Sequence, residues 1–514
     1  MNAQNRQQFA IKIMSDYYTG EPLRIGNETQ LLIDDTIIED RWRLTRVLHQ
    51  PDKFARNPIL VADKPWESGM LHGANVIWDQ ECELFRMWYL CFNNSNYHYG
   101  SGPVTYVCYA QSEDGYNWQK PLTERCAYGE YRKTNIVHYG VHDQGTYFGA
   151  PDEEGATRLQ VADKSQVFKD DDDPDPVRRY KMISLEGRPR LDLNEVHAGV
   201  QLLCSPDGFD WKLNGDKPLL DHASDCLNHV VRDTKNQRWL MFCRPPIYHS
   251  GRDHGPRNIR RRVAAMTSED LINWSYPRVV CYPDEYDLPD YDHVLVFPYG
   301  NIFVMFYGAM EGDTTGRWEL RLATSSDGFR WERYHTRETY LARGDKGAWD
   351  GGGVLPSTPP IAQGERLLFY YNGTLRGQEE QGDFLGGIGL ATIVRDRFVE
   401  QRGGETNAYL LTKEFVLEGN RLEVNLEPHK STNGVSPLLR AEVLRHPPFG
   451  EHWDFQQAFE GFGLEECDPL AVDHTAATIT WNGKSDLSAL RGQSVYLRFE
   501  LRHMGLFSFR IDDS

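Results

Sequence analysis

The stretch Ser205-Pro-Asp-Gly-Phe-Asp-Trp211 decides the fold, because its pattern of serine, aspartate, aromatic residue and tryptophan returns along the chain. Self-similar units of this kind are typical of repeat architectures. The close copies are Ser112-Glu-Asp-Gly-Tyr-Asn-Trp118, Ser268-Glu-Asp-Leu-Ile-Asn-Trp274 and Ser325-Ser-Asp-Gly-Phe-Arg-Trp331, and a degenerate copy runs from Ile393 to Val399.

Each copy predicts a β-hairpin. An alternating apolar run ends at the serine, the Asp-Gly pair reverses the chain with glycine at positive φ, and the tryptophan opens the next strand. Two more strand-like runs precede each hairpin, as in Leu84-Phe-Arg-Met-Trp-Tyr-Leu90. Five units of four antiparallel strands predict an all-β fold built on a five-bladed β-propeller.

The repeats also predict the domain boundaries. Residues 1–28 read as a lead-in, residues 29–408 as the propeller, and residues 409–514, which alternate at period two, as a β-sandwich. The outer strand of the last blade is expected at Phe398-Val-Glu400.

Composition excludes several classes of protein. The net charge of -19 over 514 residues argues against nucleic-acid and anionic-membrane partners. No apolar run reaches the ~18 residues of a membrane span, and the start at Met1 lacks an apolar signal region, so a cytoplasmic protein is expected. The nine cysteines form no C-x-x-C pair and predict reduced thiols. No zinc motif is present, so no metal or other cofactor is expected.

In a propeller, the first strand of each blade runs along the central channel, so the residues near its start crowd the channel mouth. Acids recur at this point in every repeat, either as site residues or as caps on loop N–H groups. The mouth residues are Trp66, Glu67, His72, Asn75, Asp163, Lys164, Gln166, Asp221, His222, Asp225, Asn228, Asp287, Asp290, Asp292, His293, Trp349 and Asp350.

The repeats, the opening Leu31-Leu-Ile-Asp-Asp-Thr-Ile-Ile-Glu39, the strand Arg179-Tyr-Lys-Met182 and the block Gly347-Ala-Trp-Asp-Gly resemble bacterial proteins similar to the N-terminal domain of glycoside hydrolase family 32. Families 43, 68, 117 and 130 are more distantly similar. The resemblance covers about residues 28 to 405 and implies a glycosidase. The Trp-Met-Asn-Asp-Pro, Arg-Asp-Pro and Glu-Cys motifs of family 32 are absent, so its catalytic acids do not transfer by motif.

Glycoside hydrolysis needs a proton-donating carboxyl group and a second carboxylate that acts as base or nucleophile. We expect Asp290 or Glu319 as the acid and Asp225 or Asp350 as the base or nucleophile. Glu67, Asp34 and Asp35 are further candidates, with a turn or edge role as the alternative for the last two.

Other residues at the mouth are expected to hold the sugar. Trp66 and Trp349 would stack on a ring, unless they are core residues. Arg262 ends a basic loop, residues 248–262, which either reads an anionic group on the substrate or is simply solvated. The hydroxyl-binding candidates are His72, Asn75, Asn228 and His293.

Three functions follow from this reading. The first is an exo-acting glycoside hydrolase that takes a short oligosaccharide, furanoside or fructoside-like. The second is a non-catalytic propeller that binds carbohydrate or protein, and the third is a glycoside phosphorylase or transglycosylase. The sandwich is a candidate surface for homo-oligomerisation.

Overall fold

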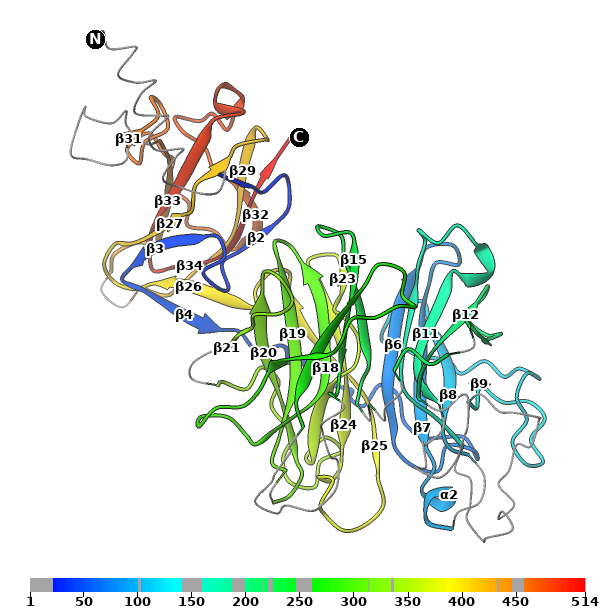
Figure 1. Ribbon diagram of the computed structural model, residues 1–514. Coiled ribbons are helices and arrows are strands. Elements are labelled where there is room, and N and C mark those ends of the chain that lie inside the picture. Colours follow the sequence, from blue (N-terminus) through cyan, green and yellow to red (C-terminus); the bar gives the residue numbers. More distant parts are fainter. Residues whose placement is uncertain are drawn as a thin grey trace. The chain divides into compact units, whose positions relative to one another are not determined.

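The computed structural model describes residues 22–99, 103–140, 160–186, 199–215, 217–220, 224, 226–245, 261–312, 314–333, 337–431, 434–445 and 457–513. The regular secondary structure of these residues is almost entirely β-strand (Figure 1). They form two compact units. The smaller unit comprises residues 1–49, 299–302 and 394–514, and the larger comprises residues 50–298 and 303–393. No helix in the described ranges is long and apolar enough to cross a membrane.

The larger unit is a β-propeller whose described strands form sheets of eight, four and nine strands, and we number five successive groups of strands in these sheets as blades. Blade one holds β6 (Leu71–Asp79), β7 (Leu84–Phe92), β8 (Pro103–Ser112) and β9 (Ile136–His138), with the short helix α2 (Asn94–Tyr99) between β7 and β8. Blade two holds β10 (Gln160–Lys169), β11 (Tyr180–Glu186), β12 (Gly199–Ser205) and β13 (Lys212–Leu213), with the 3-10 turn η1 (Pro176–Arg178).

Blades three and four repeat this order. Blade three holds β14 (His229–Asp233), β15 (Arg238–Cys243), β16 (Val263–Ser268) and β17 (Arg278–Cys281). Blade four holds β18 (Asp290–Tyr299), β19 (Ile302–Met310), β20 (Trp318–Ser325) and β21 (Glu332–Arg333).

Blade five is completed from the other end of the chain. Its strands are β22 (Gly353–Pro356), β23 (Ile361–Gln363), β24 (Arg366–Thr374), β25 (Gly386–Val394) and β5 (Asp52–Lys53). β5 pairs with β25 through Lys53 and Ala391. This corrects the expected outer strand at 398–400, because the ring closes through a pairing some 340 residues apart that no local pattern reveals.

Side chains of the inner strands link the blades into a ring. Asn75 Nδ2 donates to the Ser165 carbonyl oxygen at 2.9 Å, which joins blades one and two. Gln166 accepts from the Val230 N–H between blades two and three, and His229 contacts the Val296 carbonyl oxygen between blades three and four. Backbone pairing of β20 with β22, at Trp318 and Gly353, joins blades four and five. Ser357 donates to the Ala74 carbonyl oxygen between blades five and one.

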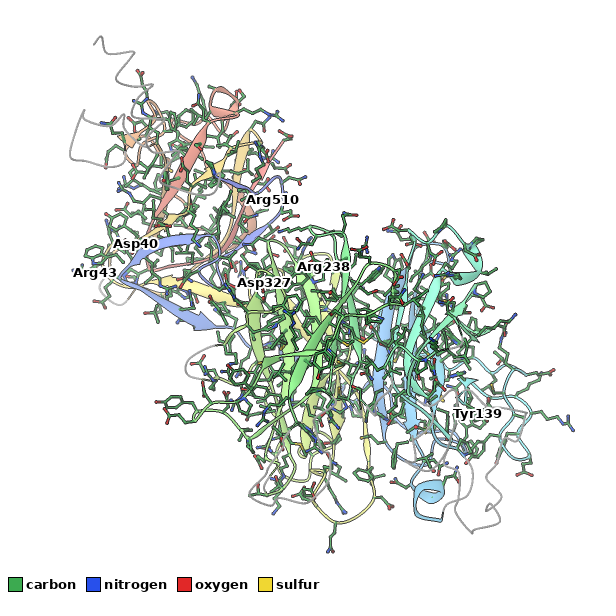
Figure 2. All side chains as sticks on the ribbon, viewed as in Figure 1. Asp40, Arg43, Tyr139, Arg238, Asp327 and Arg510 are labelled. Carbon is green, nitrogen blue, oxygen red and sulfur yellow. The ribbon has the colours of Figure 1, made fainter. Side chains whose placement is uncertain are left out.

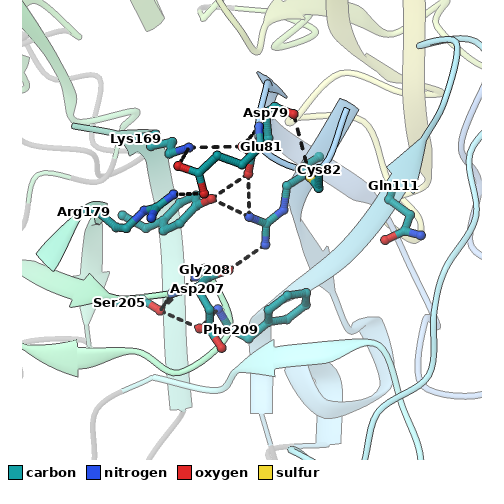
Figure 3. Close-up of polar contacts among 12 residues, drawn as sticks. Asp79, Glu81, Cys82, Gln111, Lys169, Arg179, Ser205, Asp207, Gly208 and Phe209 are labelled. Carbon is teal, nitrogen blue, oxygen red and sulfur yellow. Dashed lines mark hydrogen bonds and ion pairs between the residues drawn. The ribbon is translucent and has the colours of Figure 1, made fainter. Parts of the chain in front are cut away.

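The recurring Ser-x-Asp turn has the predicted hairpin geometry. In blade two, Asp207 accepts from the N–H groups of Phe209 and Asp210, and Gly208 has φ +81°. The turn also docks on blade one, where Arg86 donates to the Asp207 carbonyl oxygen at 2.6 Å (Figure 3). Arg238 on β15 donates to the Asp327 carbonyl oxygen, in the turn of blade four, at 3.4 Å. Figure 2 labels both residues. The repeated aspartates are therefore turn residues that help to hold neighbouring blades together.

The smaller unit is a sandwich of two sheets. One contains β1 (Leu23–Arg24), β3 (Ile38–Trp42), β27 (Ala408–Thr412), β28 (Phe415–Val416), β30 (Leu438–Arg445), β31 (Gln457–Ala458) and β33 (Ser494–Arg502). The other contains β2 (Gln30–Leu31), β4 (Leu44–Leu48), β26 (Val399–Gly403), β29 (Arg421–Pro428), β32 (His474–Thr478) and β34 (Met504–Asp512). The 3-10 turn η2 spans Ser488–Leu490.

The apolar faces of the two sheets share one core, to which β33 contributes Phe499 and β29 contributes Val424. The division of the chain differs from the predicted boundaries at 29 and 408. Residues 22–49 belong to the sandwich, because β1 to β4 add strands to both of its sheets. The alternation of residues 30–39 is typical of one strand, but this stretch forms β2 and the start of β3, which join different sheets. All nine cysteines lie in the described ranges, and none of them forms a disulfide.

Candidate active site

A cavity of about 180 Å³ lies in the propeller unit, and residues from all five blades line it. Its polar core consists of His72 from β6, Asp163 and Lys164 from β10, and Asp292 and His293 from β18. Arg244 and Arg261 enter from the two ends of the β15–β16 connection. The cavity therefore collects titratable groups from all five blades, with Arg376, Glu380 and Asp383 supplied by the β24–β25 connection of blade five.

Local backbone geometry explains how the inner strands present these side chains. Lys164 and His293 lie within their strands at φ +52° and +51°, a conformation that is uncommon for residues other than glycine. In blade one, Gly73 occupies the same kind of position at φ +59°. The strand registers shift there, between His72 and Asn75 and between Asp163 and Gln166. Such β-bulges re-aim side chains and are common beside active sites.

The residue before each left-handed position faces the cavity. These residues are His72 in blade one, Asp163 in blade two and Asp292 in blade four. A histidine and two carboxylates thus occupy corresponding places in three blades. They form the central feature of the site.

Asp292 is a buried carboxylate among cations. Arg244 Nη2 lies 3.0 Å from its Oδ1, and Arg261 Nε lies 3.3 Å from its Oδ2. Burial alone would raise the pKa of Asp292, but His293, Arg244 and Arg261 outweigh it and hold the pKa well below its usual range. Asp292 is therefore ionised at neutral pH.

Asp163 is also ionised. Its Oδ2 lies 3.6 Å from the Lys164 ammonium. Burial raises the pKa of Asp163, whereas the charges of Lys164, His72 and His293 lower it more, so the pKa falls below its usual value. The site thus contains two carboxylates that can attract a proton or stabilise positive charge, from blades two and four.

His72 is 5% exposed, and its Nε2 has no hydrogen-bond partner among the described residues. Burial, with a smaller contribution from Lys164, lowers the pKa of His72 to about 3. The imidazole is therefore neutral at physiological pH and has a buried ring nitrogen at the cavity that a ligand can satisfy.

The rim of the cavity is aromatic and belongs largely to the β24–β25 connection. Phe92 packs edge-on against Phe384 with ring centroids 5.2 Å apart, and Trp318 lines the cavity from β20. Gln378, on the same connection, accepts from Arg261 at 3.2 Å. Most residues that line the cavity are polar or charged, and its apolar members are Met70, Phe92, Trp318, Leu355, Phe384 and Leu385.

Two of the sugar-binding residues predicted from the sequence line this cavity, His72 and His293. The other predicted positions have different surroundings. Asp290 lies two residues before Asp292 and accepts from the Arg261 N–H at 2.7 Å. Asp350 is bound by Lys53 at 2.6 Å and by the Tyr371 hydroxyl at 3.1 Å. Neither is among the lining residues.

The remaining acid candidates also have structural partners. Glu67 is buried against Lys120 and Tyr89, and Glu319 pairs with Arg321 at 2.5 Å. Asp34 caps the Thr36 N–H, and Asp35 pairs with Arg41 and Arg46, all in the sandwich unit. Asp225 lies outside the described residues and stays a sequence-based candidate.

The other ligand candidates likewise bond to the protein itself. Trp66 donates to Asn135, and Trp349 lies against the Tyr371 ring. Asn75 and Asn228 donate to backbone carbonyls, and Arg262 donates to the carbonyls of Arg261 and Pro289. Most of the loop 248–262 lies outside the described ranges, including His249 and His254.

Sequence reasoning placed Asp163, Lys164 and Asp292 at the mouth without selecting them for catalysis, and it missed Arg244 and Arg261. The available signal was a titratable residue four positions before the inner-strand valine that pairs with the second strand of the blade. Val76 faces Met87 and Val167 faces Met182, which places His72 and Asp163 four residues before the paired valines.

No family model matches the chain, and no curated relative matches it. Among solved structures, the chain is similar to a glycosyl hydrolase from Bacteroides ovatus, with 14% identity and a TM-score of 0.46, over 68% of this chain and 95% of that one. It is also similar to an N-acetylgalactosamine deacetylase from F. plautii, with 16% identity and a TM-score of 0.44, over 69% and 97%. A Bombyx mori GH32 beta-fructofuranosidase matches with 10% identity and a TM-score of 0.37, over 100% and 99%. Likenesses this distant assign no activity, so the function must be argued from the cavity.

Proposed function

We propose that this chain is a glycoside hydrolase that removes a terminal sugar from a short oligosaccharide, furanoside or fructoside-like, in the propeller cavity. The observation that carries the proposal is the presence of two carboxylates in one small cavity, the buried Asp292 and the half-buried Asp163. Carboxylates on different sides of a sugar are what glycosidic cleavage requires. The aromatic rim at Phe92, Trp318 and Phe384 offers ring faces for stacking.

The lowered pKa values of Asp163 and Asp292 indicate which catalytic roles these residues can take. A lowered pKa suits a base or a nucleophile rather than a proton donor, so Asp292 and Asp163 are assigned to the former roles. The proton donor is then a third carboxyl group. Asp383 lines the same cavity, and Asp225 is the sequence-based candidate. His72, neutral and buried, would accept or donate a hydrogen bond to a sugar hydroxyl.

A second function is favoured by the cations. Lys164, Arg244 and Arg261 lie beside the two acids, an arrangement that also suits inorganic phosphate as the attacking group. In a glycoside phosphorylase, phosphate oxygen attacks the anomeric carbon while the glycosidic oxygen leaves with a proton, and the product is a sugar phosphate.

One experiment separates these functions. A panel of aryl glycosides and short oligosaccharides is incubated with the full chain, with and without phosphate. A hydrolase releases free sugar in both conditions, whereas a phosphorylase requires phosphate and yields a sugar 1-phosphate. If no glycoside is cleaved but saturable sugar binding is measured by calorimetry, the propeller is a carbohydrate-binding protein and the catalytic proposal is wrong.

A further inference from the structure

A second cluster of ligand-type side chains lies in the sandwich unit, which the proposed chemistry does not use. It consists of His49, Glu400, Glu427 and His429, and its members come from the ends of β4 and β29 and from β26. His49 and Glu400 are 351 residues apart in sequence, so no local motif could have revealed the cluster.

The cluster converges on one buried carboxylate. His49 Nε2 lies 2.9 Å from Glu400 Oε2, and His429 Nε2 contacts the other oxygen, Oε1. Glu427 Oε1 lies 3.9 Å from His429 Nε2. Ligand atoms of His49, Glu400 and Glu427 all lie within 4.8 Å of one another. Ligand atoms about 2.0 to 2.2 Å from a common metal ion are at most about 4.4 Å apart, so metal binding would draw the ligand atoms slightly closer together.

The backbone of β34 leaves room for the Glu400 carboxylate. A Cβ at Gly505, on β34, would lie 2.1 Å from Glu400 Oε1, so only glycine accommodates the carboxylate there. The His49 ring is held edge-on against Phe507, with centroids 5.0 Å apart. Both donors are therefore fixed before any ligand arrives, as preorganised metal sites require.

The net charge of the residues in and around this cluster permits a cation to bind. Arg402 binds Glu400 at 2.6 Å, and Arg397 binds Glu427 at 2.8 Å and Asp473 at 2.5 Å. Three carboxylates and two guanidinium groups leave this network with one negative charge. The Arg402 side chain is 40% exposed, so it can turn to solvent and free Glu400 for a metal ion.

We propose that His49, His429, Glu400 and Glu427 bind a divalent transition metal ion, with Zn²⁺ as the probe. Sites with two imidazole nitrogens and carboxylate oxygens favour Zn²⁺ and neighbouring transition metal ions over Ca²⁺ or Mg²⁺. The site ties β4, β26 and the end of β29 together. Its role is to stabilise the sandwich.

The test is titration of the chelator-treated full chain with Zn²⁺ by calorimetry, with Co²⁺ absorption as a second readout. We expect one site per chain, weakened about ten-fold or more by His49→Ala, His429→Ala or Glu427→Gln. Arg402→Gln is expected to bind Zn²⁺ more tightly than wild type, which a simple hydrogen-bonding cluster would not produce. His474→Ala, a change at an exposed histidine of the same unit, is the control and leaves affinity unchanged.

Melting curves with and without Zn²⁺ show whether each variant is folded. The proposal is overturned if neither wild type nor Arg402→Gln binds Zn²⁺ saturably. Equal Zn²⁺ affinity in wild type, His49→Ala and His429→Ala also overturns it.

Discussion

His72 and Asp163 occupy corresponding places in two neighbouring blades. Each precedes a residue in left-handed conformation, Gly73 at φ +59° and Lys164 at φ +52°, and each lines the same cavity. The propeller thus uses one backbone device, a bulge at the start of the inner strand, to aim different chemical groups at a common point. Asp292 before His293 is the third instance.

The burial of His72 predicts a pH dependence of stability. Its folded pKa is about 3, so the folded state stays unprotonated while an unfolded chain binds a proton below pH 6.5. The corresponding stability is present above pH 6.5 and is lost as the pH falls toward 3. Urea unfolding at pH 7.5 and pH 5 should show that wild type loses about 2 kcal/mol more than His72→Gln. The same change at exposed His474 should not alter the loss.

The recurring turn predicts a position that tolerates only glycine. Gly208 has φ +81°, and a Cβ there would lie 2.5 Å from Trp88 Cζ2, so Gly208→Ala combines strain with a clash against a buried ring. We expect a loss of at least about 2 kcal/mol in propeller stability. Gly129 is the matched control, with φ +54° but no atom within 4 Å of its Cβ. Gly129→Ala should cost only the strain, about 1 kcal/mol; equal losses in the two variants would refute the docking role of the turn.

Ring closure predicts the behaviour of Asp350. This carboxylate is buried and bound to Lys53 of β5, the strand that completes blade five. Lys53 is 29% exposed, so Asp350→Asn should cost about 1 to 3 kcal/mol rather than the full penalty of a buried pair. The melting temperature should fall while kcat at a permissive temperature stays within a few-fold. A large loss of kcat in a folded variant would restore Asp350 as a catalytic candidate.

The sequence predicted those features of the fold that residues close together in the chain determine. Ser205, Asp207 and Gly208 specify a turn within four residues, so the hairpins and the blades could be predicted. β5 and β1 to β4 could not be placed, because their partners lie hundreds of residues away. The site was predicted only in part for a related reason. Strict alternation along a strand assigns side chains to faces, and the left-handed residues Lys164 and His293 break that alternation next to Asp163 and Asp292.

The most direct test of the central claim compares Asp292→Asn with Asp171→Asn on whichever glycoside the chain cleaves. The Asp171 side chain is 77% exposed, and this residue has no role in the proposed chemistry. Asp171→Asn therefore controls for the loss of a carboxylate. We predict that Asp292→Asn lowers kcat/KM by about 10²-fold or more, with the fold retained, while Asp171→Asn has wild-type activity. Wild-type kcat/KM in a folded Asp292→Asn variant would contradict the assignment of this cavity as the active site.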